Sequence, residues 1–202
     1  PRKVYLWLLA SLGGYLLYIS QSRSAFVALA AGVLYLAKEK GWIGKYKTIF
    51  SLFITISIAL FLVIGTQKTT IFTRQYYVQG LLVFIHNPQG VGVGNFDIIS
   101  RNPENHILGL SHFSSVAHNV VLEIITGMGI LGFTFVYWLV RALHGVWEDE
   151  NKKSLVYKAV FIALFVNFLF HSTYFVPTML WLWFMSLGLS QKNRLNSFFD
   201  LL

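Results

Sequence analysis

Long apolar stretches with almost no charge alternate with short basic segments along the whole chain. A helix of about 20 mostly apolar residues crosses the hydrocarbon core of a bilayer. Four stretches approach or exceed that length: Thr48–Gly65, Val116–Val140, Leu155–Phe170 and Val176–Leu189. The last two are short and are separated only by a polar turn that starts at His171, which favours a tight hairpin. The pattern therefore predicts membrane-spanning helices rather than a soluble core.

The first apolar stretch, Val4–Ala37, is too long for one span. It holds 34 residues and a single charge, Arg23. One straight helix of that length would rise about 51 Å, well beyond a hydrocarbon core of about 30 Å. We expect two helices separated by a break at Ser20–Ser24, near the outer headgroups. The fold class is then all-α, a polytopic membrane protein with about six transmembrane helices.

The basic residues predict how this chain is oriented. If the N-terminus is cytoplasmic, twelve of the 16 Lys and Arg residues fall on the inner side. The four on the outer side are Arg23, Lys68, Arg74 and Arg101. This bias follows the positive-inside rule and predicts that both ends are cytoplasmic. We therefore expect residues 1–202 to form a single transmembrane domain with an extracytoplasmic loop over residues 66–115.

The outer loop contains its own predicted helix, Arg74–Ile85, which is apolar but too short to span. We expect an interfacial or re-entrant helix that ends at Asn87-Pro88, because proline disfavours helix in the residue before it. The turn that follows, Gly90-Val91-Gly92-Val93-Gly94, lacks the spacing and the βαβ context of a dinucleotide fingerprint. It predicts a tight turn that needs positive φ.

Composition supports the membrane interpretation and excludes several classes of protein. Hydrophobic residues make up 55% of the chain and charged residues only 12%, with a mean hydropathy of +0.60. Soluble domains have about 25% charged residues, so a soluble enzyme and a disordered chain are excluded. The absence of cysteine excludes a thiolate zinc site. The net charge of +8 is explained by topology and requires no nucleic acid. Since the sequence begins at Pro1, we expect a fragment of a longer chain.

The outer arginines are the first candidates for chemistry. An arginine at membrane depth is costly and usually faces a polar cavity or a partner. Guanidinium binds phosphate through two parallel N–H bonds, which lysine cannot reproduce. Arg23, flanked by Ser22 and Ser24, and Arg74 are therefore candidates for an anion clamp, although each could also be a headgroup anchor. Arg101 is expected to be a solvated loop residue.

The outer histidines are the second candidates. Histidine suits proton transfer near neutral pH, which makes His118 a candidate general base, or simply a polar interfacial group. Asn119 and Glu123 are four residues apart, so we expect Asn119 to turn toward Glu123 on a shared helix face. His118 would then face substrate. Five of the six histidines fall on the outer side, and His171 is another candidate among them. The few outer carboxylates lead us to expect no metal and no cofactor.

With these residues in view, the chain resembles the O-antigen ligase and O-antigen polymerase superfamily of membrane glycosyltransferases. The resemblance lies in the Ser22–Ala25 block, in Arg74 followed by the glycine turn, and in His118-Asn119, nine residues, then Gly129-Ile130-Leu131-Gly132. The Trp-rich helix at Leu180–Trp183 resembles the usual C-terminal span of the family. Family members are longer, so the chain is expected to be their C-terminal portion.

The resemblance implies a glycosyltransferase of the bacterial cytoplasmic membrane whose active face points outward. The donor would be a polyprenyl-diphosphate-linked glycan, and the acceptor lipid A core, a growing polysaccharide or a protein. His118 would act as the base and Arg23 and Arg74 would bind the diphosphate, with Ser22, Asn119, Glu123 and His171 in support. The transfer would be metal-independent and inverting. Two alternatives are a transporter or flippase module, and a structural membrane subunit.

Overall fold

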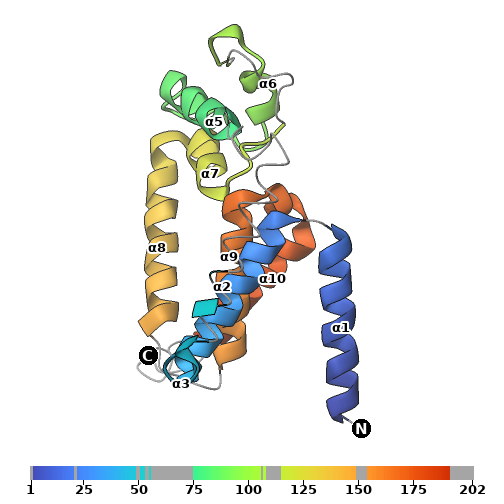
Figure 1. Ribbon diagram of the computed structural model, residues 1–202. Helices are drawn as coiled ribbons and strands as arrows, with labels where there is room; N and C mark the ends of the chain where they lie inside the picture. The colour runs from blue at the N-terminus through green and yellow to red at the C-terminus, as the bar shows by residue number, and fades with distance from the viewer. Residues whose placement is uncertain are drawn as a thin grey trace, which may run out of the picture.

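A computed structural model describes residues 2–20, 22–48, 51–52, 55, 75–105, 107, 115–148 and 154–191. Over these ranges the regular elements are α-helices and 3-10 helices, and no strand occurs among them. The helices fall into two regions (Figure 1). A bundle of long helices forms one region, and several short helices packed on one end of the bundle form the other, which we call the head.

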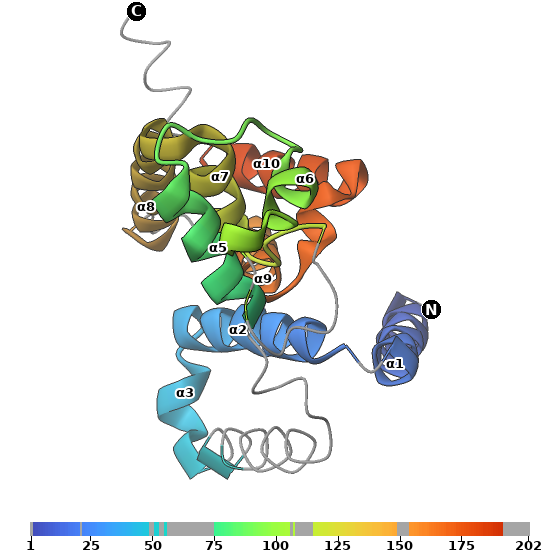
Figure 2. The same cartoon turned by 90° about the horizontal axis from the view of Figure 1, so that it is seen from above.

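The bundle contains α2 (Arg23–Glu39), α8 (Gly132–Glu148), α9 (Leu155–Phe170) and α10 (Pro177–Ser190). Helix α2 crosses α9 obliquely, and α8 and α10 lie beside α9 (Figures 1 and 2). Helix α1 (Arg2–Ser20) stands apart from the other helices in both views. The short helix α3 (Trp42–Lys45) follows α2 at the end of the bundle away from the head.

The predicted break in the first apolar stretch is confirmed. Helix α1 ends at Ser20, and α2 starts after Ser22, whose hydroxyl accepts a hydrogen bond from the Ala25 N–H at 3.4 Å. Serine is a preferred N-cap because its oxygen satisfies an amide that has no partner inside the helix. Helix α2 then packs closely on α9, since a Cβ at Gly32 would lie 3.2 Å from the Ala159 carbonyl oxygen.

Aromatic side chains form the core of the α9–α10 hairpin. Trp183 of α10 is 1% exposed and stacks on Phe161 at a centroid distance of 5.4 Å. Phe168 meets the same indole edge-on at 5.3 Å. Because aromatic side chains bury large areas and their stacked and edge-on contacts add to that burial, this cluster fixes the two helices against each other. Pro177 at the first turn of α10 is pre-organised for a helix start.

The head contains α5 (Gln75–His86), α6 (Phe96–Ser100), the 3-10 helix η2 (Pro103–Asn105) and α7 (Val120–Met128). Helix α5 confirms the helix predicted from Arg74 to Ile85 and ends before Pro88 as expected. Its buried face includes Val83, which packs with Phe96 and Ala117. Buried amides cross-link the same elements, because Gln79 Nε2 donates to the Ser100 carbonyl at 3.0 Å.

The stretch predicted as one span over Val116–Val140 is divided in the structure. The α-helix begins only at Val120, is interrupted by the 3-10 turn η3 (Gly129–Leu131), and resumes as α8. Gly129 has φ of +61° and ψ of −143°, which a side chain would oppose. The chain turns so sharply there that a Cβ at Gly132 would lie 2.8 Å from the Ile124 carbonyl oxygen. Hydropathy windows sum apolar content and do not register this turn.

Among the described residues, one helical run satisfies the length and composition of a membrane span, Val120–Glu148, which includes the turn at η3. Two shorter apolar helices occur at Trp7–Ser20 and Leu155–Phe170. The predicted span Thr48–Gly65 lies largely outside the described residues. Most of residues 66–74 and 106–114, which the sequence predicts to be outer loop, lie outside them as well.

Candidate functional site at the junction of head and bundle

His118 occupies a strained position directly before α7. Its φ is +52°, and it is the single non-glycine residue with positive φ in the part of the chain that the structure describes. Histidine visits this left-handed region more readily than most residues, yet such conformations cost about 1–3 kcal/mol. They persist only where neighbouring contacts hold them, and they cluster at functional sites. The strained backbone therefore occurs at the same residue, His118, that the sequence indicates as a candidate base.

The surroundings of His118 favour the neutral imidazole. Its ring packs on Tyr76 of α5, with centroids 5.1 Å apart and planes 35° apart. Burial lowers the pKa of His118 below its ordinary value of 6.5, and the charge of His171 lowers it further. A neutral imidazole at physiological pH has a free nitrogen lone pair, which is the form a general base requires.

Asn119 is placed differently from the sequence prediction. It is the N-cap of α7, with φ −151° and ψ 122°, and its Oδ1 accepts from the amides of Val121 and Leu122 at 2.9 and 3.1 Å. Its Nδ2 donates to the Leu169 carbonyl at 3.0 Å. The side chain therefore does not turn toward Glu123, and that expectation is wrong. A residue with extended backbone lies outside the helix, so the i, i+4 rule does not apply to it.

Glu123 bonds to the residue before His118. Its Oε2 accepts from the Ala117 N–H at 2.8 Å and from the Tyr174 hydroxyl at 3.3 Å. Tyr174 belongs to the 3-10 helix η5 (Ser172–Phe175), which joins α9 to α10. Burial raises the pKa of the Tyr174 hydroxyl well above its ordinary value, and the adjacent charge of Glu123 raises it further. The hydroxyl thus stays protonated and donates to the carboxylate.

His171 lies at the same junction. It is the C-cap of α9 and is exposed, and its amide donates to the Asn167 carbonyl at 2.9 Å. It lies two residues after Leu169, whose carbonyl accepts from the Asn119 side chain and also from the Tyr77 hydroxyl at 2.7 Å. The structure therefore brings together four of the predicted site residues: His118, Asn119, Glu123 and His171.

The arginines differ from one another. Arg23 begins α2 at the end of the bundle nearer the head and is half-buried, and its side chain has no ion pair or hydrogen bond with other described residues. The Ser22 and Ser24 hydroxyls beside it are 3.1 Å apart. Arg101 instead pairs with Asp97 at 2.9 Å with 59% of its side chain exposed, as expected for a solvated loop residue. Arg74 lies outside the described residues.

The glycine turn docks on the C-terminal end of α7. The amides of Val91 and Gly92 donate to the carbonyls of Thr126 and Gly127, both at 2.9 Å. These carbonyls lack partners within α7, so the turn supplies the cap. A Cβ on Gly90 would lie 2.5 Å from the Gly129 amide nitrogen, so both glycines are required for the backbones to touch. These two amides of the turn donate to groups of the protein itself, which agrees with a structural turn rather than a nucleotide-binding loop.

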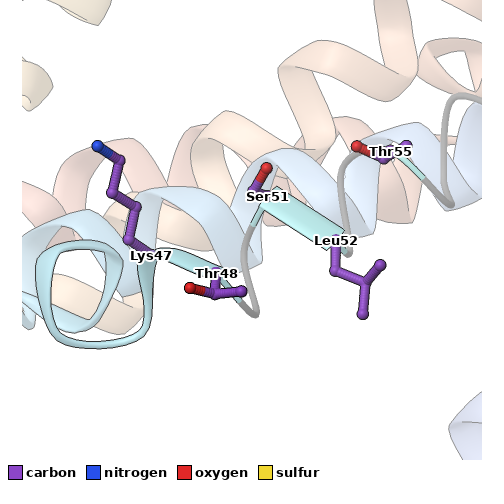
Figure 3. A pocket seen from close by; sticks show the side chains of 5 residues that line it. All are labelled: Lys47, Thr48, Ser51, Leu52 and Thr55. Carbon is purple, nitrogen blue, oxygen red and sulfur yellow. The ribbon is translucent and has the colours of Figure 1, made fainter.

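An open hollow of about 410 Å³ lies elsewhere, on the segment after α3. Lys47, Thr48, Ser51, Leu52 and Thr55 line it (Figure 3). Its lining includes one cation and no histidine or carboxylate, so it offers no acid–base pair. The chemistry of the described residues is concentrated at the junction instead.

Comparison with protein-family models relates most of this chain to one family. A family model described as O-antigen ligase matches residues 7–137, which is more than half of the chain. The chain belongs to the O-antigen ligase family. Comparison with curated proteins and with solved structures returned no significant match. The matched range includes Arg23, the glycine turn, His118 and Gly132, and it ends within α8.

Family membership associates the chain with O-antigen ligase and polymerase activity in lipopolysaccharide biosynthesis, with membranes, and with lipid-linked glycans and acceptors in general. The matched range does not reach Leu169, His171 or Tyr174, which complete the junction. Sequence reasoning missed Tyr76, Tyr77 and Tyr174. Aromatic residues near helix ends suit a membrane interface, so nothing in the sequence separated these three from others.

Proposed function

We propose that the chain is part of a multi-pass glycosyltransferase of the bacterial cytoplasmic membrane, with its active face on the outer side. It moves a glycan from a polyprenyl diphosphate to an acceptor hydroxyl on lipid A core, polysaccharide or protein. The single observation that carries the proposal is His118: a strained, half-buried imidazole with a lowered pKa, at the junction of two helical regions in an O-antigen ligase family chain.

The course of the described helices supports the six-span topology within this proposal. Helices α1 and α9 run toward the head, whereas α2, α8 and α10 run away from it (Figure 1). These are the directions that a cytoplasmic N-terminus and an outer head require. Helix α3 and the basic end of α2 lie at the opposite end, which agrees with the positive-inside rule.

The proposed reaction needs a base and a site for the leaving diphosphate. Neutral His118 takes the proton of the acceptor hydroxyl as that oxygen attacks the anomeric carbon of the donor sugar. The bond between this carbon and the diphosphate oxygen breaks, and its electron pair leaves with the diphosphate. Arg23 and Arg74 stabilise the charge that develops there through bidentate hydrogen bonds. One in-line displacement inverts the anomeric centre, and no step in this scheme calls on a metal.

Single-turnover transfer from a polyprenyl-diphosphate glycan, measured in nanodiscs with the full chain, tests the base. A general base contributes about 10²–10⁴-fold to the rate, so His118→Ala should slow transfer by that factor while donor binding persists. His118→Gln keeps a polar group that cannot accept a proton under these conditions, and it should be equally slow. Wild-type rates for both variants would remove His118 from the mechanism and leave His171 as the next candidate.

The anion clamp is tested by conservative substitution. Arg23→Lys and Arg74→Lys keep the charge but lose the bidentate geometry, so each should weaken donor binding and slow transfer. Arg101→Lys is the matched control, because Arg101 pairs with Asp97 on the surface. Full transfer by both the Arg23 and Arg74 variants would contradict the clamp.

A further inference from the structure

Two independent groups of hydrogen bonds hold the backbone on either side of His118. On the N-terminal side, the Ala117 amide donates to Glu123 Oε2 at 2.8 Å, and the Tyr174 hydroxyl donates to the same oxygen at 3.3 Å. Ala117 is fully buried. The position of this amide is therefore linked through one carboxylate oxygen to η5, a different part of the chain.

On the C-terminal side, the side chain of Asn119 bonds in two directions. Its Oδ1 caps α7, and its Nδ2 donates to the Leu169 carbonyl at 3.0 Å. The Tyr77 hydroxyl donates to the same carbonyl at 2.7 Å. This carbonyl belongs to the last turn of α9, where helix carbonyls lack partners within the helix. Asn119 is thereby linked to both α9 and α5.

We propose that Tyr77 and Tyr174 are positioning residues that hold His118 in its left-handed conformation against the end of the α9–α10 hairpin. Each acts through a shared acceptor: Tyr77 through the Leu169 carbonyl, and Tyr174 through the Glu123 carboxylate. As far as catalysis is concerned, this inference rests on the proposed role of His118 as the base. Neither tyrosine contacts the reacting atoms in the proposed scheme.

The arrangement explains why a strained residue persists at this place. A left-handed non-glycine backbone is retained only where the surrounding structure over-determines it. Here both flanking residues are fixed, one by its main chain and the other by its side chain, and both are linked to the α9–α10 hairpin. His171 is the C-cap of α9, so the same contacts also link His118 to the helix whose end carries the second histidine. Among the described residues, the other titratable groups that contact this junction are Tyr76, Tyr77, Glu123 and Tyr174.

Removing one hydroxyl while keeping its ring tests the proposal. Tyr77→Phe and Tyr174→Phe each delete a single donor. Tyr137→Phe is the matched control, because Tyr137 is exposed on α8 and its hydroxyl has no hydrogen-bond partner among the described residues. The first measurement is the titration of the His118 ring by NMR of protein labelled at its six histidines. The resonance is assigned by its loss in His118→Gln.

We expect the titration midpoint of His118 to move in both junction variants and to stay at the wild-type value in Tyr137→Phe. The second measurement is single-turnover transfer. Misplacement of a catalytic group by about 1 Å can cost 10²-fold, so we expect the rate to fall by about 10- to 100-fold with little change in donor binding. Variants that only lose thermal stability, with the wild-type midpoint and rate, would overturn the proposal.

The two measurements separate this inference from the proposed function. If the wild-type protein transfers no glycan but the His118 midpoint depends on Tyr77 and Tyr174, the positioning stands and the proposed function fails. If His118→Ala abolishes transfer but neither tyrosine variant changes the midpoint or the rate, the function stands and the positioning fails.

Discussion

The head and the bundle are held together by different kinds of contact. In the α9–α10 hairpin, apolar rings stack around Trp183, and the contacts depend on side-chain shape. In the head, main-chain groups of the glycine turn bond directly to main-chain groups at the end of α7. Buried amides such as Gln79 join α5 to α6. The hairpin of the bundle is thus specified by apolar side chains, whereas the head is also specified by hydrogen-bonding groups and by glycines at which a side chain would not fit.

This contrast has a functional meaning. An apolar core tolerates exchange of one apolar group for another of similar volume, because the exchange leaves no hydrogen-bonding group without a partner. A backbone-to-backbone contact tolerates neither an added Cβ nor a lost amide. The proposed base lies where the two regions meet, at the start of α7. Its position is therefore set by hydrogen bonds within the head and by hydrogen bonds that join the head to the end of the α9–α10 hairpin.

The largest expected effect is that of an added side chain in the head. Gly129→Ala would place a Cβ against the Gln89–Gly90 main chain in a backbone with positive φ. Neither backbone segment can move without losing its hydrogen bonds, so we expect the free energy of unfolding to fall by about 4 kcal/mol or more. Faster hydrogen exchange at the amides of the glycine turn would show that the turn has detached from α7. Gly94→Ala is the control: φ is +85° and nothing lies within 4 Å, so it should cost only about 1 kcal/mol. Equal effects would refute the docking argument.

The corresponding change in the bundle is Trp183→Leu. It removes the ring that stacks on Phe161 and should cost about 2–3 kcal/mol, somewhat less than truncation to alanine. Trp181→Leu, two residues away and 66% exposed, should change stability by less than about 0.5 kcal/mol. Thermal unfolding in detergent compares the two variants. If Trp181→Leu lowers the stability as much as Trp183→Leu does, the aromatic core is not what holds the two helices of the hairpin together.

A smaller effect is expected at the contact between the regions. Asn119→Ala removes both the cap of α7 and the bond to the Leu169 carbonyl, and should cost about 1–2 kcal/mol. Asn119→Ser keeps a capping oxygen but has no amide donor for Leu169, so it should recover most of the stability and little of the transfer rate. Thermal unfolding and single-turnover transfer measure the two parts separately. Full recovery of both would show that the cap alone matters.

The smallest effect is that of pH on the head. The folded-state pKa of His118 is below its ordinary value of 6.5, so protonation favours the unfolded state. The stability contributed by neutral His118 is present above pH 6.5 and declines as the pH falls through that value. We expect hydrogen exchange in α7 to rise between pH 7.5 and 5.5 more than exchange in α10, and His118→Gln to reduce that difference. An equal rise in both helices would count against a local effect.

The sequence predicted the bundle better than the head, for physical reasons. The break near Ser22 follows from length and from the local preference of serine for a helix N-cap. The interruption of Val116–Val140 depends on Gly129 meeting Gly90, a contact between positions far apart in the chain that no local pattern reveals. Asn119 was expected on a helix face and proved to be the N-cap. Tyr77 and Tyr174 could not be singled out, because their partners are a main-chain carbonyl and a carboxylate from other helices.

The Leu169 carbonyl has a consequence for mutagenesis. Two side chains from different helices donate to this one oxygen, which no substitution by another L-amino acid removes. Alanine scanning at position 169 would therefore report only on the leucine side chain and would miss a bundle acceptor to which two residues of the head donate. The peptide linkage between Leu169 and Phe170 can instead be replaced with an ester. This change weakens the Leu169 carbonyl as an acceptor without altering any side chain, and it would reveal the role of that oxygen.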